Sequence, residues 1–119
     1  MALDPRLRPL LVDFATGEGP ALCSSFEAVL FELRQLKGDQ ALAAWVRASR
    51  SVHTLKGSAA SLELEGVARL ARELETALAP LKTSPSPLRA DQLDALLEAA
   101  ALIRGQLAGV ISWATNARA

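Results

Sequence analysis

Apolar residues recur every three or four positions along most of the chain, which is the period of an amphipathic α-helix. This spacing predicts five helices, over residues 2–15, 20–36, 40–61, 65–79 and 91–113. Residues 16–20 include two glycines and a proline and predict the first interruption, which begins at Gly17, and Gly38 predicts the second. Pro80 predicts the end of the fourth helix, because proline lacks the N–H that a continuing helix needs.

Short connections join the last four predicted helices, which is typical of an up-down-up-down four-helix bundle. We therefore predict an all-α fold with a bundle over residues 20–113 and an additional short N-terminal helix within residues 1–15. Residues 82–89 are rich in proline and serine and predict an internal loop, with Asp91 as the N-cap of the last helix. The roughly 30 residues after this loop are too few for a core of their own, so residues 1–119 are predicted to form a single domain.

Composition agrees with a helical fold, because Ala and Leu fill 45 of the 119 positions whereas Val and Ile fill eight. Thirteen basic and thirteen acidic residues cancel, which argues against nucleic acid or an anionic membrane as the partner and favours a protein. No apolar run approaches the roughly 20 residues that span a bilayer. The single Cys23, interpreted as a small residue at the edge of the core, fits a reducing compartment, and we expect a cytoplasmic location.

One polar segment interrupts the apolar pattern in the middle of the third predicted helix. The buried stripe of that helix is predicted to consist of Leu42, Trp45 or Val46, Val52, Leu55, Ala59 and Leu62. A second, outward-facing stripe next to it consists of Ser49, His53, Lys56 and Ala60, which are spaced by four, three and four residues. Gly57 lies beside this outward stripe, and a glycine inside a helix costs about 1 kcal/mol relative to alanine. We therefore expect another helix or a partner protein to approach closely there.

His53, the only histidine, is the candidate reactive group. Imidazole is nucleophilic when neutral and titrates near neutral pH. If His53 took up a phosphoryl group, the ammonium of Lys56 could offset the new negative charge. One His and one Cys do not supply the three or four ligands of a metal site, so no metal is expected.

Glu75 is the candidate carboxylate that would orient the imidazole ring. If the third and fourth helices are antiparallel and connect near Glu63, His53 lies ten residues before the connection and Glu75 twelve residues after it. The two side chains should then lie at similar heights. More ordinary interpretations stay open: a partly buried structural His53, a solvated Lys56, and a surface Glu75 in contact with Arg72.

The segment His53-Thr54-Leu55-Lys56-Gly57-Ser58-Ala59 resembles the His-x-x-Lys-Gly signature of histidine phosphotransfer (HPt) domains, including the N-terminal phosphorylation domain of CheA-type chemotaxis kinases. Arg50, three residues before the histidine, is also similar to that family. Residues 70–75 resemble the family segment whose glutamate pairs with the phosphorylated histidine. The chain differs from many members in having Glu63, and no glycine, where the third helix turns into the fourth.

The resemblance implies that His53 accepts a phosphoryl group on Nε2 from a histidine kinase domain and passes it to an aspartate of a response regulator. Lys56 and Glu75 would assist, while Ser49, Arg50, Gly57 and Ala60 would contact the partner. The domain would need no cofactor of its own, since ATP belongs to the kinase domain and Mg²⁺ to the regulator, and it would not be an enzyme by itself. We also consider that the chain is a fragment of a CheA-type kinase.

A different class of function stays open, namely a bundle that binds a kinase or regulator as a scaffold or inhibitor without accepting phosphate. Retention of His53 and Lys56 argues against it, because a pure binder needs neither. A stand-alone hydrolase is disfavoured because the sequence presents no nucleophile–base pair.

Overall fold

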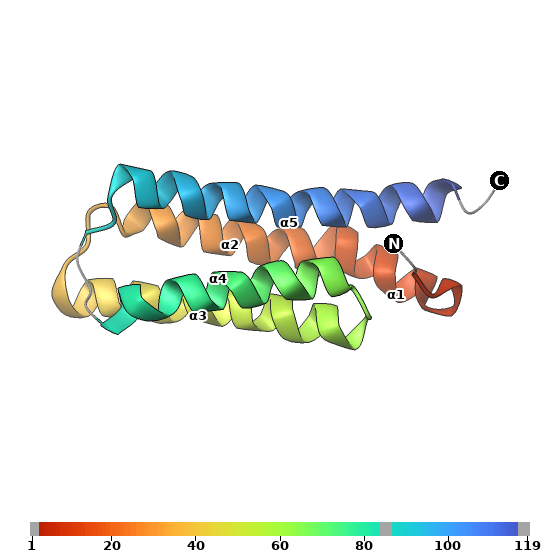
Figure 1. Ribbon diagram of the computed structural model, residues 1–119, viewed down its shortest axis with the longest axis horizontal. Coiled ribbons are helices and arrows are strands. Elements are labelled where there is room, and N and C mark those ends of the chain that lie inside the picture. The colour runs from red at the N-terminus through yellow and green to blue at the C-terminus, as the bar shows by residue number, and fades with distance from the viewer. Residues whose placement is uncertain (1–2, 84–86, 117–119) are drawn as a thin grey trace.

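The computed structural model describes residues 3–83 and 87–116, and these are almost entirely helical, without a β-strand. A 3₁₀ turn (η1, Pro5–Leu7) leads into α1 (Arg8–Asp13), a π-helical turn (η2, Phe14–Glu18) and α2 (Gly19–Glu32). The chain then forms α3 (Gly38–Ser61), α4 (Glu65–Thr83) and α5 (Ala90–Asn116) (Figure 1). The prediction of an all-α four-helix bundle is confirmed.

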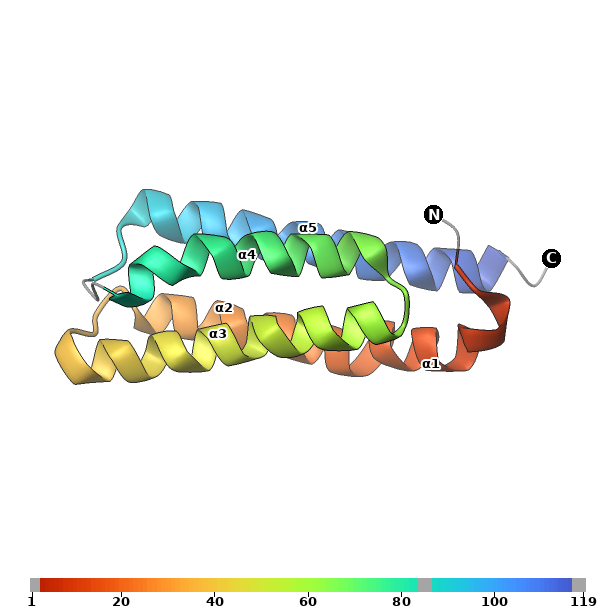
Figure 2. The same cartoon turned by 60° about the horizontal axis from the view of Figure 1, so that its bottom comes forward.

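The four long helices run alternately up and down along a molecule 53 Å long (Figures 1 and 2). α3 packs against α2 and α4, and α5 completes the bundle by packing against the same two helices. The largest fully buried side chains in the core are Trp45, Phe26, Leu11, Leu30, Leu33, Leu55 and Leu78. Leu42 was wrongly assigned to the core: it is 44% exposed, because α3 turns Ala41, Ala44 and Ala48 inward instead. Of the alternatives Trp45 and Val46, Trp45 is the buried residue.

The predicted interruption at residues 16–20 is wrong, since the backbone stays helical from α1 into α2 (Figure 2). The N–H of Gly19 donates to the carbonyl of Phe14, five residues back, so one wide π turn carries the chain past Pro20, which lacks a donor. A Cβ on Gly19 would lie 2.9 Å from both the Phe14 carbonyl oxygen and Leu107 Cδ1. The glycine therefore permits close packing against α5 and does not end a helix. The short N-terminal helix of the prediction is the first part of one long helix.

The predicted stop at Pro80 is also wrong, because α4 continues to Thr83. Pro80 and Thr76 are both exposed, so water can take the place of the N–H that proline cannot offer to the Thr76 carbonyl. Of the predicted loop over residues 82–89, the first two residues are thus helical, and residues 84–86 lie outside the described residues.

The chain is anchored between α4 and α5 by Leu88, which is buried and whose N–H donates to the carbonyl of Leu33 at 3.0 Å. The start of α5 is capped by Gln92, whose Oε1 accepts from the N–H of Arg89 at 2.9 Å. Asp91, the predicted N-cap, instead pairs with the Arg89 side chain at 3.0 Å.

The turn between α3 and α4 depends on a left-handed residue. Glu63 has φ of 61°, and its N–H donates to the Ala60 carbonyl while the N–H of Leu64 donates to the Ala59 carbonyl at 2.8 Å. These two bonds form a Schellman motif, in which glycine usually occupies the left-handed position. The turn therefore forms without the glycine, with Glu63 in a backbone conformation that is costly for a residue with a side chain.

By length and composition alone, α5 could cross a membrane. A core helix of a helical bundle passes the same test. In this structure Leu96, Ala100, Ile103, Leu107 and Val110 of α5 are buried in the bundle.

Candidate functional site

His53 projects from the middle of α3, with 71% of its side chain exposed to solvent. Its Nδ1 lies 3.1 Å from Oε2 of Glu75 on α4. An ionised carboxylate can only accept a hydrogen bond, so this contact requires the proton on Nδ1 and leaves the lone pair of Nε2 unprotonated in the neutral ring. The arrangement presents an unprotonated ring nitrogen at an exposed position.

The antiparallel α3–α4 hairpin brings these residues together. The turn centred on Glu63 places His53 and Glu75 at similar heights, as the sequence register predicts. The distance between them confirms the predicted proximity and rules out the interpretation of Glu75 as a surface residue engaged only with its own helix. The exposure of most of the His53 side chain excludes the interpretation of His53 as a buried structural residue.

Lys56 joins the pair through the second carboxylate oxygen, with its Nζ 2.5 Å from Oε1 of Glu75. The Lys56 side chain is 33% exposed and that of Glu75 is 28% exposed. One carboxylate therefore holds both the imidazole and the ammonium, one helical turn apart on α3.

The pKa of Glu75 reflects two opposing effects. Partial burial raises the pKa of Glu75, whereas hydrogen bonds from Lys56 and His53 lower it. Together the hydrogen bonds outweigh the burial, so the pKa of Glu75 lies below the usual carboxyl value. Glu75 is therefore ionised at neutral pH.

The surface beside His53 is open and composed of small residues. Gly57 and Ala60 are exposed, and a Cβ on Gly57 would have no neighbour within 4 Å apart from the adjacent residues and the nearby backbone of α3. Close packing inside the domain therefore does not account for Gly57. Of the other predicted contact residues, Arg50 is exposed but the hydroxyl of Ser49 is buried, so that hydroxyl does not reach the surface.

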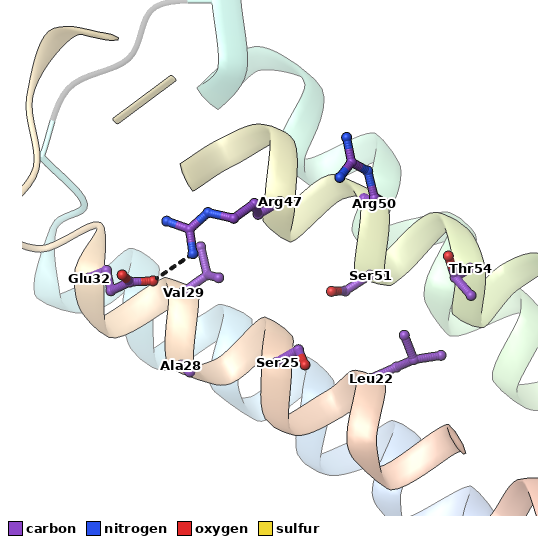
Figure 3. A pocket seen from close by; sticks show the side chains of 9 residues that line it. All are labelled: Leu22, Ser25, Ala28, Val29, Glu32, Arg47, Arg50, Ser51 and Thr54. Atoms are coloured by element: carbon purple, nitrogen blue, oxygen red, sulfur yellow. Dashed lines mark hydrogen bonds and ion pairs between the residues drawn. The ribbon is translucent and has the colours of Figure 1, made fainter. Parts of the chain in front are cut away.

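The sequence did not indicate the residues that flank this surface. Glu18, in the π turn, accepts a hydrogen bond from Ser58 Oγ at 2.9 Å and so joins the first helix to α3 one residue beyond Gly57. Arg47 and Thr54 border a groove between α2 and α3 (Figure 3). Glu18 was missed because residues 16–20 were interpreted as an interruption between two helices.

Within residues 3–83 and 87–116, no group of three or more His, Cys, Asp or Glu side chains could hold a metal ion. Cys23 is buried, and burial raises the pKa of its thiol, so this cysteine is a packing residue.

Comparison with known families places this geometry in context. The family model described as "Hpt domain" matches residues 21–108, which include His53, Lys56 and Glu75. No curated protein and no solved structure shows a significant match to the chain.

Proposed function

Because the chain belongs to the Hpt domain family, whose members carry phosphoryl groups in two-component signalling, we propose that His53 is its phospho-accepting residue. One observation carries the proposal: an exposed imidazole whose Nδ1 is held by an ionised carboxylate, so that Nε2 is available. Hpt domains interact with kinases and response regulators, and they are carriers of the phosphoryl group and not catalysts.

The lone pair of Nε2 would attack the γ-phosphorus of ATP held by a kinase domain. The Nε2–P bond forms as the bond from phosphorus to the bridging oxygen breaks, and ADP leaves with that electron pair. The ring keeps its proton on Nδ1 and becomes positively charged, and Glu75, 3.1 Å away, stabilises that charge. No proton has to leave Nε2, so the domain needs no general base.

Lys56 would act on the phosphoryl group itself. Its ammonium lies one turn along α3 from the ring and offsets the negative charge that arrives with the phosphoryl oxygens. The reverse half of the cycle uses the same groups: a regulator aspartate attacks the phosphorus, the Nε2–P bond breaks, and the ring returns to neutral.

We assign the donor to a histidine kinase domain, the acceptor to a receiver domain, and the pathway to chemotaxis-type signalling in the cytoplasm. ATP would stay with the kinase and Mg²⁺ with the regulator, so this domain would contribute no cofactor. The His53, Lys56 and Gly57 pattern and the resemblance to CheA-type domains support this assignment, and the formal net charge of zero argues against nucleic acid as the partner.

The test is to incubate the protein with phosphoramidate, a small phosphoryl donor, and separately with a histidine kinase and labelled ATP. We expect one phosphoryl group that is acid-labile and base-stable, absent from His53→Gln and present in the matched surface variant Glu73→Gln. Circular dichroism should show the same helix content in all three proteins. Labelling of His53→Gln at the wild-type level would overturn the proposal, and a wild type that binds partners without being labelled would favour a scaffold.

A further inference from the structure

The outward face of α5 carries no charge over most of its length. The exposed positions that follow Glu98 are Ala101, Leu102, Gly105, Ala108, Gly109, Ile111, Ser112, Thr115 and Asn116. The one charged residue in that stretch, Arg104, turns toward α2, where its guanidinium pairs with Glu27 at 2.7 Å. From residue 99 to residue 116 the helix rises about 26 Å at about 1.5 Å per residue. A long strip of surface is therefore left without a charged side chain.

Packing inside the domain does not explain the residues of this face. Only 28% of the residues in an apolar 18-residue stretch of α5 are buried, and Leu102 is 56% exposed. Gly105 and Gly109 each cost the helix about 1 kcal/mol relative to alanine. A Cβ on either glycine would have no neighbour within 4 Å apart from the adjacent residues and the nearby backbone of α5. The domain thus presents an apolar helix face that its own core does not use.

The face matches itself in shape. At 100° per residue, Leu102 and Gly109 lie on the same edge of the outward face, and Gly105 lies at its centre between them. A second copy turned end for end, by a two-fold axis that crosses α5 near Gly105, places Leu102 of each copy against Gly109 of the other. Both contacts form at once, because a two-fold interface repeats every contact. Small residues at the centre let the two helix backbones approach closely.

The face also matches itself in charge, and only in the antiparallel direction. Its acidic residues all lie in the first half of α5, at Asp91, Asp94 and Glu98. Two parallel copies would set these carboxylates beside each other, which is costly at an interface. The antiparallel arrangement moves Asp94 of one copy to the height of Thr115 in the other, where Arg8 of α1 lines the same groove. No ion pair joins Arg8 or Asp94 to another described residue, so two new Arg8–Asp94 pairs can form.

We propose that the domain forms a two-fold dimer through the outward face of α5, with the two helices antiparallel and crossing near Gly105. A second copy of this chain is the occupant because shape and charge both match under the same two-fold axis. A membrane surface is disfavoured, since helices that lie on anionic lipid carry basic residues beside their apolar face and this face carries acidic ones. One pair of helices is a small interface, so the dimer is expected to dissociate in the micromolar range.

The dimer would leave both reactive centres accessible. α5 lies diagonally across the bundle from α3: each contacts α2 and α4, and no contact joins the two helices in the part of the chain that the structure describes (Figure 1). The two His53 side chains would therefore lie on opposite outer sides of one particle. The inference does not rest on the proposed function, because none of its residues belongs to the His53–Glu75–Lys56 cluster.

The first test measures mass by sedimentation velocity on the full chain, from low micromolar to submillimolar concentration. Leu102→Glu places a charge in the contact, and Gly109→Leu fills the depression that would receive Leu102. Leu42→Glu, at an exposed apolar position of α3, is the matched control. We expect the wild type to shift from one chain to two, both α5 variants to raise the dissociation constant at least about tenfold, and the control to stay within about twofold. Leucine is more apolar than glycine and a better helix former, so a loss in Gly109→Leu cannot come from unfolding or from lower hydrophobicity.

The second test addresses the antiparallel direction by exchanging charges. Arg8→Glu and Asp94→Arg each place like charges opposite each other, so each should weaken the dimer. The double variant should restore the dissociation constant to within about twofold of the wild type. Arg8 also stacks over Trp113, but a rescue by Asp94→Arg cannot repair that contact, because Asp94 lies at the other end of α5. Circular dichroism should show the same helix content in every variant.

A wild type that keeps the mass of one chain at every concentration would overturn the dimer. A dimer that Leu102→Glu and Gly109→Leu leave intact would overturn the assignment to α5, and a double charge variant without rescue would overturn the antiparallel arrangement. A monomeric wild type that sediments with phosphatidylcholine vesicles, while Leu102→Glu does not, would assign the face to lipid and also overturn the proposal.

Discussion

Glu75 Oε2 lies 3.1 Å from His53 Nδ1, across the contact between two antiparallel helices. The carboxylate thus holds the ring by one nitrogen and leaves the other exposed. The same carboxylate binds Lys56 through its second oxygen, so loss of its charge would affect both the ring and the ammonium.

Glu75→Gln keeps a hydrogen-bond acceptor for Nδ1–H but removes the negative charge that stabilises a positively charged ring. We expect the rate of His53 phosphorylation to fall about tenfold to a hundredfold, by analogy with the loss when a group that orients a metal-binding histidine is replaced. The measurement is the initial rate of labelling by a kinase. Glu73→Gln, on the exposed side of the same helix, should keep the wild-type rate, and an equal loss in both variants would contradict the role of Glu75.

The lowered pKa of Glu75 predicts how stability depends on pH. Because the pKa is lower in the folded state than its ordinary value of 4.5, the folded state favours the ionised form. The stabilisation is therefore complete at neutral pH, and it is lost as the pH falls below 4.5 through the folded pKa. Urea unfolding should show wild type more stable than Glu75→Gln at pH 7, with the difference shrinking at pH 3. A difference that grows toward acid would contradict this sign.

Glu63 predicts a stabilising substitution. Glycine removes the left-handed penalty of about 1–2 kcal/mol, which stabilises the folded state. It also increases the conformational entropy of the unfolded chain, which destabilises the fold by roughly 0.4–1 kcal/mol. Glu63→Gly should therefore increase the free energy of unfolding by about 1 kcal/mol in urea titrations. Glu63→Ala is the control, since alanine keeps the penalty but removes the charge. A similar gain for both variants would indicate an effect of charge instead of backbone conformation.

Two glycines should respond in opposite directions to alanine. A Cβ on Gly57 meets nothing within 4 Å, so Gly57→Ala should gain about 1 kcal/mol of helix stability. A Cβ on Gly19 would lie 2.9 Å from Leu107 Cδ1 on α5 and 2.9 Å from the Phe14 carbonyl oxygen, so Gly19→Ala should lose roughly 1–3 kcal/mol by overpacking both contacts. Thermal unfolding of the two variants checks the signs. A loss of stability in Gly57→Ala would mean that the glycine is needed inside the domain.

Apolar periodicity was sufficient to predict the bundle and the heights of His53 and Glu75, because helix length and a short antiparallel turn determine register. The predictions that failed were the helix ends assigned from Gly and Pro, at residues 16–20 and at Pro80. Gly19 is explained by contact with Leu107, and Pro80 lies on an exposed side of α4, and neither fact can be read from neighbouring residues.

The surroundings of α3 could not be predicted for a related reason. Glu18 reaches Ser58 of α3 from a π turn, and that turn lies in a run interpreted as an interruption. The groove between α2 and α3 depends on which residues of α2 lie opposite Arg47, which is determined by the packing of two helices and not by either sequence alone.

The continuous first helix has a mechanical consequence. α1 and the last turns of α5 pack against each other beyond the α3–α4 turn, so the molecule narrows from four helices to two at that end (Figures 1 and 2). Because α1 and the last turns of α5 pack against fewer helices, their amide hydrogens should exchange with solvent before those in the middle of α3. Local unfolding of the α1–α5 end would leave His53 and Glu75 in contact, because α3 and α4 do not extend to that end. The reactive centre is therefore expected to be structurally independent of that end of the molecule.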